Sequence, residues 1–438
     1  MTLRRLTDNR SILHAIRLAL CCIGLVGLAG CGEPQPAVFK LNSVELLKQE
    51  KLFLSSGQSF DDRYSAEIGT ILTAFFGTPD QPRVPSVLPE DDPALEVLSQ
   101  DNLDVSAGPV LSTHDADGYR GKGLYREHCV HCHGITGDGA GQTARILNPY
   151  PRDFRLGKFK FKSTPLRSMP TDSDMMQLLV KGIPGSSMPS FRGLPESDLK
   201  ALIDYVKYLT IRGQYERYLM AELSNLEDGE PLIDLAAASV EDEDDPAKEK
   251  YLDSMFDLVG EGLVEDVVER WIDTDDNRSE VPEAPAEMVL DHPDHQTLVD
   301  QGRVLYYTRG NCAQCHGESV AGNGQTETFD DWTNEWIKSP GVDPFVPATY
   351  ADFTAAGALP PRPILPRNLT SGEFRGGGQP GDLYLRIANG IEGTPMPAAA
   401  TLKSDEIWAL VAYVKALPFI DVDQRLRYKS VNNNMIAK

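Results

Sequence analysis

Two stretches of the chain place apolar residues at the three-and-four spacing that buries one face of a helix. The first stretch follows Ser197 and Asp198 and the second follows Ser404 and Asp405, and both residue types are common at helix N-termini. This spacing predicts one amphipathic helix in each stretch. The apolar positions are Leu199, Leu202, Val206 and Leu209 in the first and Ile407, Leu410, Val414 and Leu417 in the second.

The remaining segments are patterned less regularly. Residues 31–115 contain two short apolar helical patterns followed by a proline-rich segment, and they form an N-terminal extension of unknown role. Residues 214–290 are acidic around Glu241–Asp245, but the apolar positions from Met255 to Trp271 suffice for one or two packed helices. We therefore expect an acidic, partly helical linker, and an extended tail at 421–438.

The two predicted helices belong to a longer internal repeat. Gly182–Pro189 (GIPGSSMP) matches Gly390–Pro397 (GIEGTPMP) at an offset of 208 residues, which persists into the Tyr-Val-Lys of each helix. Further upstream, Pro151–Phe154 (PRDF) parallels Pro366–Leu369 (PRNL). A loop and the helix that follows it are therefore duplicated as a unit.

Each repeat contains a CxxCH motif, CVHCH in the first and CAQCH in the second. The two thiols of such a motif can add to the two vinyl groups of one porphyrin, and the histidine that follows is placed to bind its iron. Zinc and a disulfide are the alternatives, but neither motif has the second CxxC or HxxxH partner that zinc would need. The motifs predict two covalently bound haem c groups; the attachment residues are Cys129, Cys132 and His133 for the first and Cys312, Cys315 and His316 for the second.

On these motifs and loops, the segments Gly121–Leu209 and Gly302–Leu417 resemble class I cytochrome c domains. The resemblance implies that an N-terminal and a C-terminal helix cross beside each haem. We therefore expect a mainly α fold with two cytochrome c-like helical haem domains, called here the first domain (116–213) and the second domain (291–420).

The second domain departs from the family pattern by one insertion. About eighty residues separate His316 from Met396, against about fifty-five between His133 and Met188. The extra residues include Trp332, Trp336 and the proline-rich run 360–366, and their glycine and proline content predicts loop. Such an insertion covers a haem edge, makes a subunit contact or packs as filler.

The resemblance assigns the second axial ligand of each iron to a methionine. An iron that only passes electrons needs two axial ligands, and methionine sulfur favours the ferrous state. Met188 and Met396 occupy equivalent positions in the repeat, each followed by proline. Met169 is the alternative to Met188, but it has no counterpart in the second repeat and is expected to pack internally.

Other histidines are possible competitors for the irons. His128 and His131 flank or interrupt the first motif, and we expect them at the surface. His114, His292 and His295 precede their domains by enough chain to reach an iron. Bis-histidine ligation by one of them would give a lower reduction potential.

Basic residues cluster from Arg152 to Arg167 in an otherwise acidic chain. Arg152 and Arg367, which lie in the Pro-Arg turn of the two repeats, are candidates for bidentate contacts with haem propionates. The other members either form a docking face for a redox partner or have no specific role; they are Arg155, Lys158, Lys160, Lys162 and Arg167.

The N-terminus has the pattern of a secretory signal. Four arginines precede an apolar run of about a dozen residues that ends at Leu28-Ala29-Gly30 before Cys31. The run resembles a bacterial lipoprotein signal, which implies that residues 1–30 are removed and that Cys31 is lipidated; an uncleaved anchor is the alternative, but about twenty residues are needed to span a bilayer. This places the protein on the periplasmic side of a bacterial membrane, lipid-anchored, in an oxidising compartment.

Composition narrows the function further. The 438 residues have 41% hydrophobic and 24% charged residues, as in an ordinary globular protein, and a net charge of −23 that disfavours nucleic acid and favours basic partners. We expect a membrane-tethered dihaem cytochrome c that transfers single electrons in a respiratory chain. Its partners would be a quinol-oxidising complex, a terminal oxidase or a periplasmic dehydrogenase. The alternatives are a catalytic dihaem oxidoreductase, of peroxidase or thiosulfate-oxidising type, and a haem-bearing subunit of a fixed respiratory complex.

Overall fold

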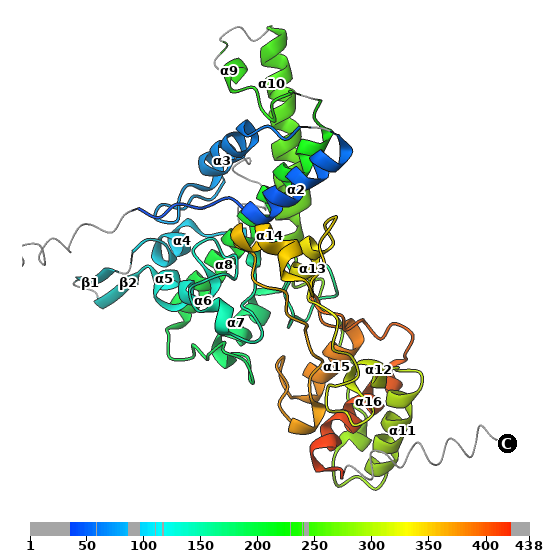
Figure 1. The fold of residues 1–438 in the computed structure, drawn as a ribbon. Helices are drawn as coiled ribbons and strands as arrows, with labels where there is room; N and C mark the ends of the chain where they lie inside the picture. The colour runs from blue at the N-terminus through cyan, green and yellow to red at the C-terminus, as the bar shows by residue number, and fades with distance from the viewer. Residues whose placement is uncertain are drawn as a thin grey trace, which may run out of the picture. The chain divides into compact units, whose positions relative to one another are not determined.

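The protein is described from a computed structural model. It describes residues 36–421 except 58, 86–96, 110, 116–117, 228, 239 and 241–244. The predicted signal peptide, Cys31 and nearly all of the tail therefore lie outside the described residues. The described part is mainly α-helical with one β-hairpin, and this confirms the mainly α fold with two cytochrome c-like domains (Figure 1).

The helices and strands follow the order expected from the repeat. Those before the linker are α2 (Ser43–Ser56), α3 (Arg63–Phe76), α4 (Gln100–Ser106), β1 (Leu111–Asp115), β2 (Gly118–Lys122), α5 (Leu124–His128), α6 (Val130–His133), α7 (Asp172–Lys181) and α8 (Glu196–Glu222). The later ones are α9 (Leu235–Ala238), α10 (Pro246–Phe256), the π-helical segment η5 (Asp257–Val268), α11 (His295–Tyr307), α12 (Ala313–His316), α13 (Asp331–Ile337), α14 (Ala351–Ala355), α15 (Pro380–Asn389) and α16 (Ser404–Ala416).

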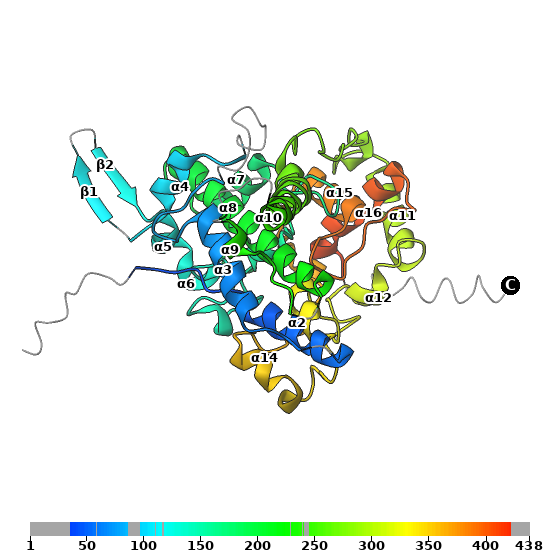
Figure 2. The ribbon, with the colours of Figure 1, turned by 90° about the horizontal axis from the view of Figure 1, so that it is seen from above.

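Helix α8 is the main packing element of the first domain (Figures 1 and 2). Its predicted apolar positions Leu199, Leu202 and Leu209 are buried, which confirms the helix. The helix continues to Glu222, beyond the last residue of the predicted pattern, because its second half is also buried against the N-terminal extension and the linker. There, Arg212 and Glu216 form a buried ion pair, and Glu216 also accepts a hydrogen bond of 2.6 Å from the backbone N–H of Asn42.

The second domain is built around the crossing of α11 and α16 (Figure 2). Gly302 of α11 lies at the crossing, where a Cβ atom would come within 1.9 Å of the Ala409 carbonyl oxygen. Only glycine lets the two backbones approach this closely. The first domain has a shorter counterpart, since α5 spans only five residues and follows the β1–β2 hairpin, while α4 of the N-terminal extension also packs on α8.

The helix before each methionine loop is capped in the same way. Thr171 and Asp174 exchange side-chain-to-backbone hydrogen bonds of 3.1 Å at the start of α7. At the start of α15, the Asp382 carboxylate accepts from the Gln379 backbone N–H at 3.1 Å. These contacts satisfy backbone donors that the first turn of a helix leaves free, so both loops leave helices with fixed first turns.

The linker and the insertion both differ in detail from simple loops. The acidic linker is partly helical as predicted, and Leu263, Val267 and Trp271 of its second half are buried. The prediction that the insertion is loop is wrong for α13 and α14, which form a small core of their own around Phe329, Trp336 and Phe353. Bulky aromatic residues in the insertion supply enough apolar surface to hold two short helices, whereas 360–366 is non-helical as its prolines predict.

Candidate metal centres

A cavity of about 200 Å³ lies beside the CxxCH motif of the first domain. Every residue that the sequence predicts for the first site lines this cavity, namely Cys129, Cys132, His133, Arg152 and Met188. The remaining wall is largely apolar and includes Leu179, Phe191, Ile203 and Val206. An apolar cavity with two cysteines, a histidine and a methionine in its wall fits a covalently attached haem.

The histidine of each motif is held by a backbone carbonyl. His133 Nδ1 lies 3.1 Å from the Arg152 carbonyl oxygen, and His316 Nδ1 lies 3.0 Å from the Arg367 carbonyl oxygen. A carbonyl only accepts, so Nδ1 carries the proton and Nε2 is left to bind a metal. Burial lowers the pKa of His133 to about 4 and also lowers the pKa of His316, so both imidazoles are neutral.

The cysteines are placed by short helices that end at these histidines. Cys129 and Cys132 lie three residues apart around α6, so their side chains can face the same ligand. None of the four cysteines in the described part forms a disulfide. Burial raises the pKa of Cys129 to about 12 and that of Cys312 to about 11, which reflects apolar surroundings at both motifs.

The two methionine loops have the same internal hydrogen bonds. The carbonyl oxygens of Met188 and Met396 each accept from an isoleucine N–H five residues earlier, Ile183 and Ile391, at 3.1 Å. The methionine backbone N–H groups donate to a hydroxyl two residues earlier, at 3.3 Å for Met188 and 3.2 Å for Met396. The sequence repeat is therefore also a repeat of structure, although the assignment of both methionines as iron ligands stays a prediction.

A buried tyrosine forms a hydrogen bond to the backbone directly after each CxxCH motif. Tyr125 donates a hydrogen bond of 2.8 Å to the carbonyl of Gly134, and Tyr306 donates one of 2.9 Å to the carbonyl of Gly317. Each glycine directly follows the histidine of its CxxCH motif. The hydroxyl groups thus satisfy carbonyls at the ends of α6 and α12, which would otherwise be costly to bury.

The competing residues differ in their relation to the first cavity, since His128 and His131 line it, whereas Met169 does not. Met169 is fully buried in the core and does not line the cavity, in keeping with a packing role. His131 is exposed as predicted, whereas His128 is half-buried and meets the Phe191 ring edge-on. His295 Nδ1 lies 2.7 Å from the Glu287 carbonyl oxygen at the start of α11.

Most of the basic cluster is used inside the molecule. Arg155 pairs with Asp153, Lys158 lies 3.6 Å from Glu335, and Lys162 forms a buried ion pair with Glu392. The interpretation as a docking face is therefore wrong for Arg155 and Lys162, whose side chains are buried in these pairs. Their acidic partners lie either far away in the sequence or two residues away in a tight turn. A pattern of charges along the sequence does not show which residues will pair in these ways.

Each of the two candidate propionate arginines lies near the methionine loop of the other domain. Arg152 lines the first cavity, and its guanidinium carbon lies 4.4 Å from the centre of the Trp332 ring. Arg367 pairs with Glu373 at 2.8 Å. Their contact with haem carboxylates stays a prediction.

Among the lining residues that sequence reasoning missed, two come from the second domain. Trp332 of α13 and Arg375 line the cavity together with residues of the first domain. The signal for Arg375 was present, since Gly157, Phe159 and Lys160 match Gly372, Phe374 and Arg375 at the same offset as the two Pro-Arg turns. Lys160 also lines the cavity.

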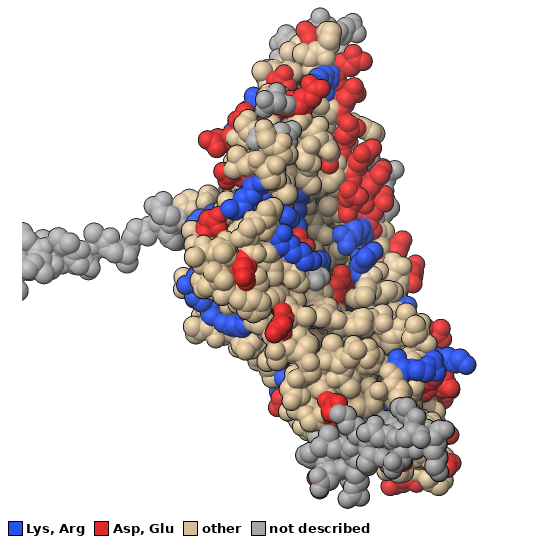
Figure 3. Space-filling view, turned by 45° about the vertical axis from the view of Figure 1, so that its right-hand side comes forward, with Lys and Arg blue, Asp and Glu red and all other residues tan. Residues whose placement is uncertain are grey.

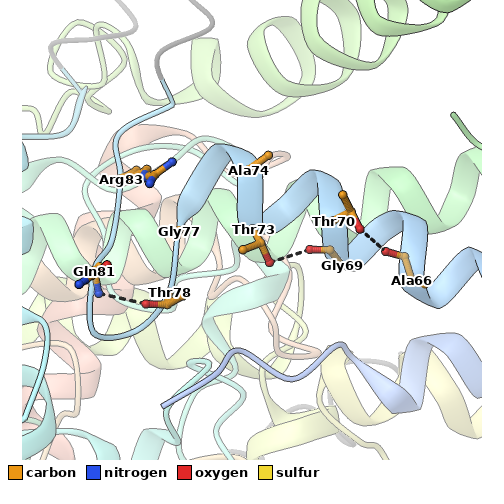
Figure 4. A pocket seen from close by; sticks show the side chains of 9 residues that line it. All are labelled: Ala66, Gly69, Thr70, Thr73, Ala74, Gly77, Thr78, Gln81 and Arg83. Carbon is orange, nitrogen blue, oxygen red and sulfur yellow. Dashed lines mark hydrogen bonds between the residues drawn. The ribbon is translucent and has the colours of Figure 1, made fainter. Parts of the chain in front are cut away.

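A second hollow lies on the outer side of α3 and is unrelated to the motifs (Figure 4). Its lining is small and polar, and its hydroxyl groups bond within the element, as in the 2.7 Å hydrogen bond from Thr73 to the Gly69 carbonyl. Arg83 is the charged residue of this lining. Such a surface offers no chemistry for catalysis or metal binding.

The family comparison agrees with the cavity. The model of the cytochrome c family matches residues 119–210 and 299–418, so that each motif lies within its own match. The chain is a dihaem c-type cytochrome. It carries two covalently bound haem c groups, transfers electrons through them and acts with redox protein partners. In the described part of this cytochrome, no group of three or more His, Cys, Asp or Glu side chains is arranged to hold a metal ion by itself.

A solved structure, a reducing HAO-like protein complex from Kuenenia stuttgartiensis, is 25% identical; the similarity covers 70% of this chain and 99% of the other, with a TM-score of 0.43. A TM-score this low does not establish a shared overall fold. No curated protein sequence matches the cytochrome.

Proposed function

We propose that this cytochrome is a membrane-tethered relay that passes single electrons between respiratory partners on the periplasmic side of a bacterial membrane. The bound haem iron supplies the one-electron redox chemistry. In the first domain the chain lines the haem site with apolar side chains. In both domains it orients the imidazole through a backbone carbonyl and offers a methionine from a loop with the same hydrogen bonds.

The main support for a relay function is that both domains contain an equivalent methionine loop. A catalytic haem needs an open or labile axial position, whereas a relay works best with both axial positions filled. In the first domain, His133 and Met188 line the same cavity, and Met396 lies in a loop with the same hydrogen bonds. The pattern favours two closed irons and argues against peroxidase-type or thiosulfate-oxidising chemistry.

Carbon monoxide tests this relay directly. We expect the ferrous protein, as isolated and without denaturant, to leave its absorption spectrum unchanged when carbon monoxide is added, because both axial positions are filled. A sample unfolded in denaturant serves as the positive control. Ready binding at either haem of the native protein would overturn the relay in favour of a catalytic cytochrome.

The proposal of a lipid tether is based on the lipoprotein signal pattern in the sequence, which ends at Cys31 and lies outside the described residues. No helix in the described part is both long and apolar enough to cross a membrane. We expect Cys31→Ser to shift the cytochrome from the membrane fraction to the soluble fraction, whereas Cys22→Ser, within the apolar run, leaves it membrane-bound. Equal membrane retention of both variants would refute lipidation at Cys31 and favour an uncleaved anchor.

An exposed acidic stripe fits a basic redox partner. From α10 through η5 to the residue directly after it, the linker carries exposed carboxylates at every fourth position, at Glu249, Asp253, Asp257, Glu261, Glu265 and Glu269. Acidic side chains form a band along one edge of the face in Figure 3. Charge of one sign steers a partner of opposite sign into an encounter complex, in which redox proteins bury little area. A quinol-oxidising complex, a terminal oxidase or a periplasmic dehydrogenase with a basic face would suit it.

A further inference from the structure

The first haem cavity is completed by the second domain. Trp332 and Arg375 both lie in the wall of this cavity, although each is more than 140 residues from Met188 in the sequence. Arg375 Nη2 donates a hydrogen bond of 3.1 Å to the carbonyl of Gly185, three residues before Met188. The methionine loop of the first domain is therefore in direct contact with the second domain.

The contact between the domains is reciprocal. A Cβ atom on Gly185 would come within 2.5 Å of Arg367 Nη2, and a Cβ atom on Gly393 would come within 2.8 Å of Arg152 Nη1. The two glycines are equivalent in the repeat, and so are the two arginines. Both glycines also have positive φ, +65° and +70°, which disfavours other residues. Each methionine loop thus receives an arginine from the other domain.

The surroundings of Arg375 leave its positive charge without an anionic partner among the described residues. Its Nε atom is buried and has no hydrogen-bond partner, and Arg375 forms no ion pair, among the residues that the structure describes. Burial, with a contribution from the nearby Arg367, lowers the pKa of Arg375. Arg375 is half-buried, and a guanidinium that is partly withdrawn from water without a carboxylate partner is costly, because its charge and its buried Nε–H lose hydration.

A haem supplies this anion, since its apolar ring carries two propionate carboxylates. We propose that Arg375 of the second domain binds a propionate of the haem in the first domain, so that the first haem site is built by both domains. A planar guanidinium can form two parallel hydrogen bonds to a carboxylate. The proposal rests on the first haem alone and holds whether the protein is a relay or a catalyst.

This arrangement has a measurable consequence for the first haem. A cation beside the haem stabilises the ferrous state, which carries one positive charge less than the ferric state. Loss of Arg375 therefore lowers the reduction potential of the first haem. The alternative is that Arg375 serves the haem of its own domain, as its counterpart Lys160 lies at the cavity of its own domain.

A redox titration of the full-length protein separates these alternatives. We place Arg375→Gln in a Met396→His background, where bis-histidine ligation moves the second haem to a lower potential and makes the two titration steps distinct. We expect the ferrous-to-ferric ratio of the first haem to fall roughly tenfold at a fixed electrode potential, the size of one charge acting through a partly screened interior. Arg375→Lys keeps the charge but loses the planar fork, so less than half of the shift should remain.

Arg309→Gln is the matched control. It removes the same charge from the second domain, but Arg309 is exposed, pairs with Glu406 and does not line the cavity. We expect neither step of its titration to move. An unchanged first haem in a folded Arg375→Gln protein would overturn the proposal, and a shift confined to the second haem would assign Arg375 to its own domain instead.

Discussion

Replacing Met188 or Met396 by histidine should lower the reduction potential of one haem by a few tenths of a volt. Axial ligands set haem potentials over about 0.8 V, and exchange of a thioether for an imidazole removes the ligand that favours ferrous iron. Each variant should also abolish about half of the weak sulfur-to-iron charge-transfer band of the oxidised protein. The double variant should abolish all of it, as measured by absorption spectroscopy and redox titration.

Met169→Leu is the control for this experiment. Met169 is fully buried but does not line the first cavity, so its replacement should leave the charge-transfer band and both potentials unchanged. Loss of half the band in Met169→Leu, together with retention in Met188→His, would transfer the axial role to Met169. Retention of the full band in both histidine variants would show that neither predicted methionine binds iron.

Replacing Lys162 by methionine should destabilise the protein by about 3–5 kcal/mol, because it leaves a buried carboxylate without its cation. The ion pair joins Lys162 of the first domain to Glu392 of the second, and their side chains are 4% and 9% exposed. Glu392 lies in the methionine loop, four residues before Met396. The loss should be visible as a lower denaturant midpoint, monitored by tryptophan fluorescence and circular dichroism.

A double variant tests whether this loss arises from the unpaired charge. Lys162→Met combined with Glu392→Leu removes both charges, so it should recover much of the stability that the single variant loses. Lys200→Met breaks the exposed pair with Glu196, whose side chains are 61% and 74% exposed, and should change the midpoint little. If Lys162→Met unfolds at the wild-type midpoint, the ion pair does not stabilise the contact between the domains.

The sequence predicted several local features around the two CxxCH motifs that the structure also has. A CxxCH motif specifies its own geometry within five residues, and the repeat identified two methionine loops whose hydrogen bonds the structure shows to be the same. The helical spacing in α8 and α16 also marked faces that are buried. These features depend on residues that are close together in the sequence, so they can be recognised from a single sequence.

The contacts between the domains were not predictable in the same way. Lys162 and Glu392 are 230 residues apart, and no periodic pattern specifies that pair. The basic cluster from Arg152 to Arg167 suggested a docking face because charge in a sequence does not reveal its partner. The role of Trp332 could not be predicted either, because only the fold places this residue of the insertion at the cavity of the first domain.

The mass of the purified, fully denatured polypeptide tests the central claim most directly, because only covalently attached groups survive denaturation. The account predicts the mass of the chain, processed at its N-terminus, plus two haems. Cys129→Ala and Cys312→Ala should each weaken attachment at one motif and leave the other haem in place. A wild-type mass with one added haem or none would contradict a dihaem cytochrome.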